Sequence, residues 1–159
     1  MSEENNGGKK AGTVAIVLVG CACGGLVLIA MLGLVAAIAV PNVVSMQYKS
    51  KRAEVPMNLM RIKIAEVEYE QDYDVYVKCS AYPSTPTKTT QMWINVASGG
   101  FKTLDFRPDG DVRGSYMVST TAYNFTATGI SDVDGDGVYA TYVATKSIRP
   151  ILITPPDVY

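Results

Sequence analysis

Residues 11–40 read AGTVAIVLVGCACGGLVLIAMLGLVAAIAV and contain no charged side chain. As a helix this stretch would be about 45 Å long, which exceeds the roughly 30 Å hydrocarbon core of a bilayer. A cleaved secretory signal carries an apolar region of only about 7–15 residues, although the first half of the stretch could pass for one. We therefore expect a membrane-spanning helix over 11–40, preceded by a cytoplasmic tail or leader over 1–10.

The composition of the chain excludes several classes of function. Its 159 residues, enough for one modest domain, include 14 Lys and Arg against 15 Asp and Glu, a balance that argues against a basic nucleic-acid binder. The chain has no histidine, so Ser-His-Asp and Cys-His catalytic arrangements and His-containing metal sites are excluded. We expect a protein that is not an enzyme, requires no cofactor and has no nucleic-acid partner.

An apolar stripe follows the span at three- and four-residue steps. It predicts that the same helix continues over 41–78 with one face against a partner surface. Pro41 and Pro56 are expected to kink this helix. The charged residues fall off the stripe, so we expect them to form a solvated face. The stripe comprises Leu59, Ile62, Ala65, Tyr69, Tyr73 and Tyr76, and the charged residues are Glu54, Lys63, Glu66, Glu68, Glu70 and Asp72.

Beyond residue 78 the pattern changes to short β-type runs. Residues 79–100 are rich in Pro, Ser, Thr and Gly and predict a connecting loop. Residues 101–149 predict an antiparallel sheet whose covered face rests on the amphipathic helix, which gives an α+β fold. The expected strands are 101–106, 112–120, 123–128 and 137–145, with a hairpin at Arg107-Pro108-Asp109-Gly110-Asp111 and a tail or edge segment over 150–159.

Residues 33–42, GLVAAIAVPN, followed by Lys49-Ser50-Lys51-Arg52-Ala53-Glu54 and Asn58-Leu59, resemble the N-terminal helix of type IV pilins and of pseudopilins such as the general secretion pathway G type. The resemblance covers about residues 26–76. It implies a pilin-like α+β fold in which a long kinked helix packs on a small sheet. It also implies a structural subunit of a type IV pilus or a type II secretion pseudopilus, which supports adhesion, motility, secretion or DNA uptake.

The family resemblance also implies partners and a location. Membrane lipid and other pilin or pseudopilin subunits would be the partners, with Gly33, Ala36, Ala37 and Pro41 in the helix that packs in the filament. Small residues there would let neighbouring helices approach closely, although glycine is also tolerated in any membrane helix. The chain would cross the bacterial inner membrane once, with its C-terminal domain in the periplasm or, in a filament, outside the cell.

The N-terminus departs from the family pattern. Pilins are cut after a glycine and carry glutamate at the fifth residue of the mature chain. The family spacing places the first mature residue at Gly20 and the fifth at Gly24. No acidic residue occurs between Ala11 and Arg52. A cut after Gly12 would leave an apolar segment about two turns longer than the family's. The resemblance therefore fits a minor or tip subunit, or an uncut membrane-anchored homologue.

Cysteine placement opens a second interpretation. Leu18-Val19-Gly20-Cys21 resembles a bacterial lipoprotein signal, in which Cys21 would be lipidated. The alternative function is a membrane-anchored or lipidated surface binding module that does not enter a filament. A small buried helix residue is the plain interpretation of Cys21. Cys79 stands alone in the C-terminal part and would be a free thiol or an intermolecular partner.

One short motif has the spacing of a metal loop. Residues 131–137 place three carboxylates at alternate positions, Asp132, Asp134 and Asp136, and their glycines allow a sharp turn. Short loops that wrap Ca²⁺ have this pattern. An EF-hand-like loop would need an acidic twelfth residue, and that position is Val143. Calcium would stabilise this loop rather than catalyse a reaction. An Asp- and Gly-rich β-turn explains the same residues without an ion.

Overall fold

The structure, a computed structural model, describes residues 30–34, 37, 39–94 and 99–159. Contacts between residues divide the chain into two units, Met1–Ser45 and Met46–Tyr159. In the first unit, the described residues are helical, and all of them except Ser45 are exposed.

A membrane-type helix lies near the N-terminus. The helix Ala30–Tyr73 contains an 18-residue window that is long and apolar enough to cross a membrane, and no part of that window is buried in the protein. A signal sequence near an N-terminus would pass the same test of length and hydropathy. Residues 11–29 of the predicted span lie outside the described residues.

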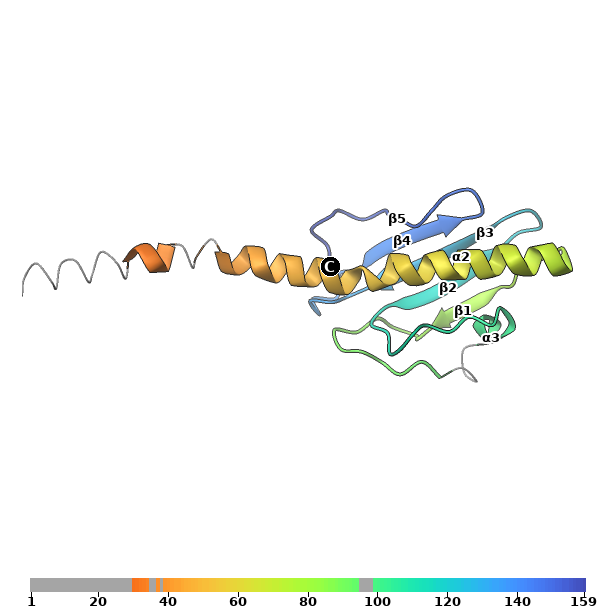
Figure 1. Cartoon of the computed structure of the whole chain (residues 1–159), viewed down its shortest axis with the longest axis horizontal. Helices are drawn as coiled ribbons and strands as arrows, with labels where there is room; N and C mark the ends of the chain where they lie inside the picture. Colours follow the sequence, from red (N-terminus) through yellow and green to blue (C-terminus); the bar gives the residue numbers. More distant parts are fainter. Residues whose placement is uncertain (1–29, 35–36, 38, 95–98) are drawn as a thin grey trace, which may run out of the picture. The chain divides into compact units, whose positions relative to one another are not determined.

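The second unit begins with the helix that covers the sheet (Figure 1). Residues 39–52 are helical, Ala53 forms a one-residue turn, and α2 runs over Glu54–Tyr73. The turn precedes Pro56, whose ring lacks a donor and crowds the carbonyl group four residues earlier. The predicted irregularity at Pro56 is thus a short break, whereas the helical assignment continues through Pro41.

The helix ends earlier than residue 78. Asp74 adopts a left-handed conformation with φ 58°, and its N–H donates to the Glu70 carbonyl oxygen at 2.9 Å. This conformation turns the chain away from the helix axis. Tyr76 therefore lies in the connection to the sheet, and Tyr73 is 62% exposed, so the predicted stripe stops at Tyr69.

The sheet is an antiparallel meander in the order β1-β2-β3-β4-β5. Each strand pairs with the next one along the chain. The strands are β1 Cys79–Tyr82, β2 Ser115–Thr120, β3 Phe125–Ser131, β4 Ala140–Thr145 and β5 Ile151–Leu152. The predicted α+β architecture, a long helix on an antiparallel sheet, is confirmed at this level of description.

The core lies between α2 and one face of the sheet. Strand β3 alternates buried and half-buried residues, with Phe125 and Ala127 on the buried face, as a sheet covered on one side requires. A Cβ atom on Gly129 would lie 2.6 Å from Val55 Cγ1, so a glycine here allows close contact with the helix. On β4 the covered residues are Ala140, Tyr142 and Ala144.

The predicted strand over 101–106 is wrong. Gly100–Thr103 form the short helix α3, and the Phe106 N–H donates to the Phe101 carbonyl oxygen at 2.9 Å. Phe101 and Leu104, three residues apart, are both buried, a spacing that suits a helical turn better than a strand. The predicted hairpin at residues 107–111 therefore does not form, and Val112 pairs instead with Gln91 in an isolated bridge.

The predicted loop over 79–100 contains regular structure and part of the core. Strand β1 occupies its first residues, and Trp93 packs with its ring centroid 4.9 Å from Tyr82, 5.5 Å from Phe101 and 5.6 Å from Phe106. This aromatic cluster extends the core beside α2. The sequence predicted that the sheet is covered by the helix. The structure corrects this, because the aromatic cluster covers part of the sheet as well.

Candidate functional site

The surface of α2 and of the helical residues just before it that faces away from the sheet carries several exposed apolar side chains. Met46 is 62% exposed, Met57 68% and Ile64 49%, and none of them contacts the core. Residues at seven-residue steps from Ser50 and from Met46 share this surface. We name it the exposed stripe, and its exposed members are Met46, Ser50, Ala53, Met57, Ile64 and Gln71. Met60 and Val67 are half-buried at its edge, and Val67 also packs against the core.

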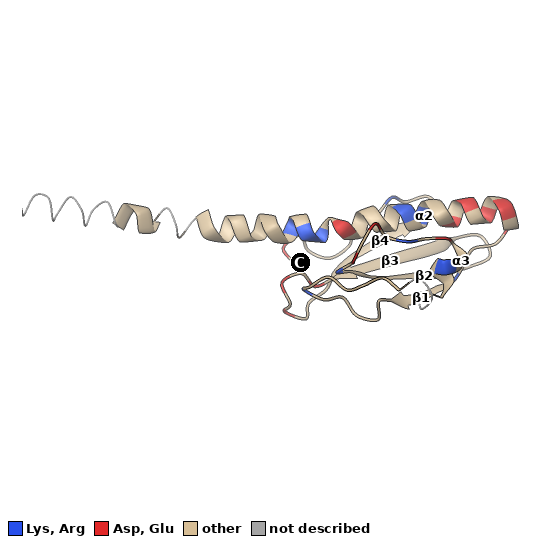
Figure 2. Ribbon diagram, turned by 60° about the horizontal axis from the view of Figure 1, so that its bottom comes forward, with Lys and Arg blue, Asp and Glu red and all other residues tan. Residues whose placement is uncertain are grey.

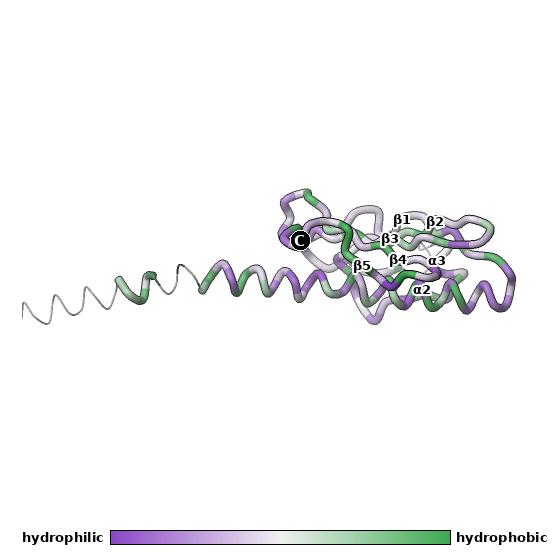
Figure 3. Tube along the Cα trace, turned by 90° about the horizontal axis from the view of Figure 1, so that it is seen from above, coloured by the Kyte–Doolittle hydropathy of each residue, from purple (hydrophilic) through white to green (hydrophobic). Residues whose placement is uncertain are grey.

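The exposed stripe and the buried face lie on opposite sides of one helix. Successive residues of an α-helix are rotated by about 100°, which places Met57 and Ile64 roughly 140–160° from Leu59. Leu59 and Ile62 have no exposed surface and point into the core. Along the helix, hydrophobic residues recur between hydrophilic ones (Figure 3). A helix that covers a core with one face needs no second apolar face for folding.

Two grooves border the distal half of the exposed stripe. One of about 280 Å³ is lined by residues that include Arg61, Ile64 and Glu68, and the other, of about 480 Å³, by residues that include Ile64, Val67 and Gln71. Ile64 thus forms a ridge between two hollows. Ridges and grooves of this kind are the features by which helices interlock.

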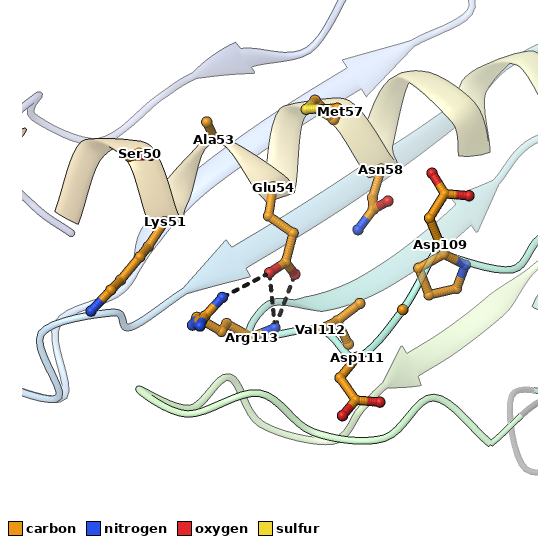
Figure 4. Close-up of a pocket in the computed structure, with 12 residues that line it drawn as sticks. Ser50, Lys51, Ala53, Glu54, Met57, Asn58, Asp109, Asp111, Val112 and Arg113 are labelled. Carbon is orange, nitrogen blue, oxygen red and sulfur yellow. Dashed lines mark hydrogen bonds and ion pairs between the residues drawn. The ribbon is translucent and has the colours of Figure 1, made fainter. Parts of the chain in front are cut away.

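A third groove, of about 490 Å³, lies between the start of α2 and the loop before β2 (Figure 4). Its main charged group, Glu54, is engaged in the fold. One carboxylate oxygen accepts from Arg113 N at 2.9 Å and from the Tyr116 hydroxyl at 3.0 Å, and Asn58 donates to the same hydroxyl at 2.9 Å. These bonds join α2 to β2 and to the residues just before that strand. Glu54 is therefore half-buried and structural, not part of the solvated face that the sequence predicted.

Glu66 is fully buried, which corrects its predicted place on the solvated face. One oxygen accepts from Val77 N at 2.9 Å, and the other has no hydrogen-bond partner among the described residues. Burial raises the pKa of Glu66 to about 7, and the Val77 N–H lowers it in part. The carboxyl group therefore secures the connection between α2 and β1.

Cys79 lies beside Glu66 and is a free, buried thiol. Burial, and to a smaller degree the nearby Glu66 charge, raise the pKa of Cys79 to about 12. A thiol with this pKa stays protonated and is a poor nucleophile at neutral pH. Of the two predictions for Cys79, the structure supports the free thiol over an intermolecular partner.

Arg52 binds the C-terminal segment to the helix. Its guanidinium group donates to the carbonyl oxygens of Pro156, at 3.3 Å, and Val158. It also lies 5.3 Å from the centroid of the Tyr159 ring and 5.9 Å from that of Tyr142. These contacts explain why Arg52 is only 7% exposed. The predicted tail over 150–159 is thus an edge strand, β5, followed by a segment held against the helix.

The predicted metal loop brings its three carboxylates together. One oxygen from each of Asp132, Asp134 and Asp136 lies within 4.8 Å of the others. Two of these side chains also form the turn, because Asp132 accepts from Gly135 N at 2.8 Å and Asp136 accepts from Val138 N at 2.7 Å. Asp134 Oδ1 is buried and has no hydrogen-bond partner among the described residues.

Neighbouring residues partly oppose an ion in this loop. Lys88 Nζ donates to the Asp134 carbonyl oxygen at 3.1 Å, which places an ammonium group against the backbone of the loop. Val143 lies on β4 and supplies no ligand, as the sequence had indicated. The loop offers fewer oxygens than the six to eight that Ca²⁺ takes, so water would complete the coordination.

The remaining predicted site residues lie near the N-terminus, and several of them are outside the residues that the structure describes. Gly12, Gly20, Cys21 and Ala36 lie outside the described residues. Gly33 is helical, and a Cβ atom built on it would meet nothing within 4 Å. Ala37 and Pro41 are likewise helical and exposed.

Comparison with protein-family models, with curated proteins and with solved structures finds no match to this chain. The functional argument therefore rests on the chain itself.

The exposed stripe was not predicted from the sequence. The signal was present, because Ser50, Met57, Ile64 and Gln71 follow one another at seven-residue steps. The stripe of Leu59, Ile62 and Tyr69 has stronger apolar residues and conceals this second pattern. A count of both faces of the helix would have found it.

Proposed function

We propose that the chain is a structural, pilin-like subunit whose helix packs against helices of other subunits in a type IV pilus or a type II secretion pseudopilus. The membrane-type segment anchors it in the bacterial inner membrane before assembly, with the folded unit in the periplasm. The observation that carries the proposal is the exposed stripe on α2. A monomeric anchored domain has no use for this second apolar face.

Packing energies support this assignment. Burial of an exposed Met or Ile side chain contributes about 1.5–3 kcal/mol, so a few such residues suffice to hold one helix against another. Small and polar residues at Ser50 and Ala53 let backbones approach at the proximal end of the stripe. The GLVAAIAVPN segment supplies similar small residues nearer the N-terminus.

The test is a pair of substitutions on the exposed stripe, Met57→Glu and Ile64→Glu. Both side chains are exposed, so the variants are expected to fold with unchanged thermal unfolding. The expected result is a loss of at least tenfold from filaments sheared off the cell surface, or from pseudopili, with normal amounts in the membrane. Quantitative immunoblotting of the two fractions measures this.

Tyr123→Glu is the matched control. Tyr123 is 89% exposed and lies in the turn before β3, outside the exposed stripe. We expect this variant to enter filaments as the wild-type chain does. If the wild-type chain stays in the membrane fraction, the alternative function is correct, and the chain is an anchored surface module. An acyl group on Cys21, detected by intact mass, would identify the lipidated form.

We propose, as a second property, that Asp132, Asp134 and Asp136 bind calcium and stabilise the loop. The buried, unpartnered Oδ1 of Asp134 beside two other carboxylates favours this proposal. Asp134→Ala with Asp136→Ala is expected to lower the melting temperature only when calcium is present. Lys88→Gln is expected to strengthen calcium binding, because it removes an ammonium group from the site. Equal destabilisation in chelator would contradict the proposal.

A further inference from the structure

The strands of the sheet contain no charged residue. Among the described residues, Asp, Glu, Lys and Arg lie on the helix and in the connections, and none lies in β1 to β5 (Figure 2). A sheet that is covered on one face usually carries polar and charged side chains on the other, and edge strands are often protected by Lys. The face of this sheet that points away from α2 therefore lacks the charges that such a face usually has.

The residues of this face form rows across the strands. Alternate residues of β2, β3 and β4 are buried towards α2, so the residues between them point to the other side. One row, in which each residue pairs with the next, consists of Met117, Thr128, Val143 and Ile151. The neighbouring row consists of Ser119, Thr126 and Thr145. We name these two rows the outer sheet face.

Strand propensity explains only part of this composition. Threonine is favoured in strands because its β-branched side chain fits a pleated surface, so the three threonines need no partner. The two ends of the first row are different. Met117 is 42% exposed and Ile151 49% exposed, and neither belongs to the core of the unit. Folding thus does not require apolar side chains at these positions.

The absence of charge favours a second copy of the chain as the occupant of this face. In a two-fold contact each copy presents the same surface, so a charge near the axis would lie close to its own copy and repel it. A threonine hydroxyl both donates and accepts, so hydroxyl groups of two copies can satisfy one another. Contacts between different proteins generally use complementary charges, and this face offers none.

We propose that the outer sheet face is covered by the outer sheet face of a second copy, in a two-fold dimer whose sheets stack face to face. Stacked sheets lie about 10 Å apart, with mean strand directions within about 30° of each other. The exposed stripe lies on the opposite side of the folded unit, beyond α2. One chain can therefore make both contacts, and the dimer goes beyond the proposed function, which concerns the helix.

The area of the face indicates a weak contact. Its three main strands are six or seven residues long. With β5 they cover about 400 Å² per copy, whereas a stable interface buries about 800 Å² on each partner. Copies held in one membrane have a raised effective concentration, so the strength of the contact rests on the anchorage proposed above. β-Branched side chains also lose little rotamer freedom when they are covered.

The experiment uses two differently tagged copies of the full chain in the same cells. Both carry Met57→Glu and Ile64→Glu, which removes contacts through the exposed stripe. After mild formaldehyde treatment, one tag is isolated and the other is measured by immunoblotting. We expect the copies to be isolated together. Thr128→Lys in both copies, or Thr128→Glu in both, should lower the yield several-fold, because like charges then meet at the centre of the face.

A mixed pair gives the sharpest test. Thr128→Lys in one copy and Thr128→Glu in the other should restore co-isolation, because opposite charges then face each other across the contact. Thr128→Ser keeps the hydroxyl group and should behave as the unchanged chain does. Lys102→Glu, on the exposed surface of α3, is the control for charge changes elsewhere. If thermal unfolding shows that a Thr128 variant is misfolded, Met117→Lys on the same row replaces it.

The other outcomes overturn the inference. Equal co-isolation of the charged variants and the unchanged chain means that the face is not the contact. Failure of the mixed pair to recover means that the face is covered by a different partner. Complete absence of co-isolation also overturns the dimer. The proposed function is judged separately, from the filament fraction of the chain with an intact exposed stripe. Recovery of the chain in the soluble fraction would contradict the anchorage, and co-isolation from that fraction would still decide the contact.

Discussion

The two faces of α2 have similar side chains and opposite surroundings. Leu59 and Ile62 are completely buried on the face of α2 that contacts β3 and β4. Met57, two residues before Leu59, is 68% exposed, and Ile64, two residues after Ile62, is 49% exposed. The buried face contributes to the stability of the domain. The exposed face contributes little to it and is available for assembly. Substitutions on the two faces should therefore separate folding from function.

The largest effect is expected at Leu59. Leu59→Ala removes a side chain with no exposed surface and leaves a cavity between helix and sheet. This should lower the free energy of unfolding by about 3 kcal/mol. Urea unfolding of the full chain in detergent measures this. A loss below about 1 kcal/mol would mean that α2 is not the main cover of the sheet.

Glu66 makes the buried face sensitive to pH. Because burial raises its pKa from 4.5 to about 7, the folded chain binds this proton more tightly than the unfolded chain does. The stabilisation is fully present below about pH 4.5 and is lost as the pH rises through about 7, a change on the order of 3 kcal/mol. Glu66→Gln keeps an acceptor for Val77 N without the charge.

Thermal unfolding at pH 4 and pH 8 tests this prediction. Glu66→Gln is expected to match the wild type at pH 4 and to exceed it at pH 8. Glu68→Gln, on an exposed residue of the same helix, is the control and should not change the dependence on pH. A wild-type chain whose unfolding temperature is equally high at pH 8 would argue against a buried, ionising Glu66.

Arg52 should have an intermediate effect. Arg52→Gln loses the donors to Pro156 and Val158 and the contact with the Tyr159 ring, at a cost of about 1–2 kcal/mol. Amide hydrogen exchange of residues 151–159 should rise while exchange in β3 stays slow. Arg149→Gln, on an exposed side chain, provides the comparison. Unchanged exchange in the C-terminal segment would show that other contacts hold it.

The smallest effect is expected at Met57. Met57→Ala removes a side chain that is 68% exposed and outside the core, so the free energy of unfolding should change by less than about 0.5 kcal/mol. Measured beside Leu59→Ala in the same detergent, it gives the contrast between the two faces directly. A loss comparable to that of Leu59→Ala would mean that the exposed stripe is part of the folding core.

The sequence predicted the general architecture because periodicity reports burial. The apolar steps at Leu59, Ile62 and Tyr69 and the strand-like residues after Phe125 were sufficient to predict a helix on an antiparallel sheet. It could not predict α3, because in so short a run Phe101 and Leu104 have the spacing of a helix whereas Leu104 and Phe106 have that of a strand. Strand β1 was missed because it lies among Pro, Ser and Thr residues and is stabilised by its neighbour β2.

The candidate site was predicted less well. The three carboxylates of the loop were found because alternation along five residues brings them together locally. Glu66 was assigned to solvent because charge usually indicates exposure, and its burial depends on the long-range contact with Val77. The exposed stripe was missed because one helix carries two apolar patterns, and only the stronger one was considered.

The burial of Cys79 has a practical consequence for thiol chemistry. In the folded chain its sulfur is enclosed and protonated, so alkylating reagents and spectroscopic labels would react with an introduced cysteine at Ser50 or Gln71 long before they reach it. Once the sheet separates from the helix, the same sulfur becomes accessible. The rate at which Cys79 is alkylated is therefore a built-in measure of opening, obtained without any added probe.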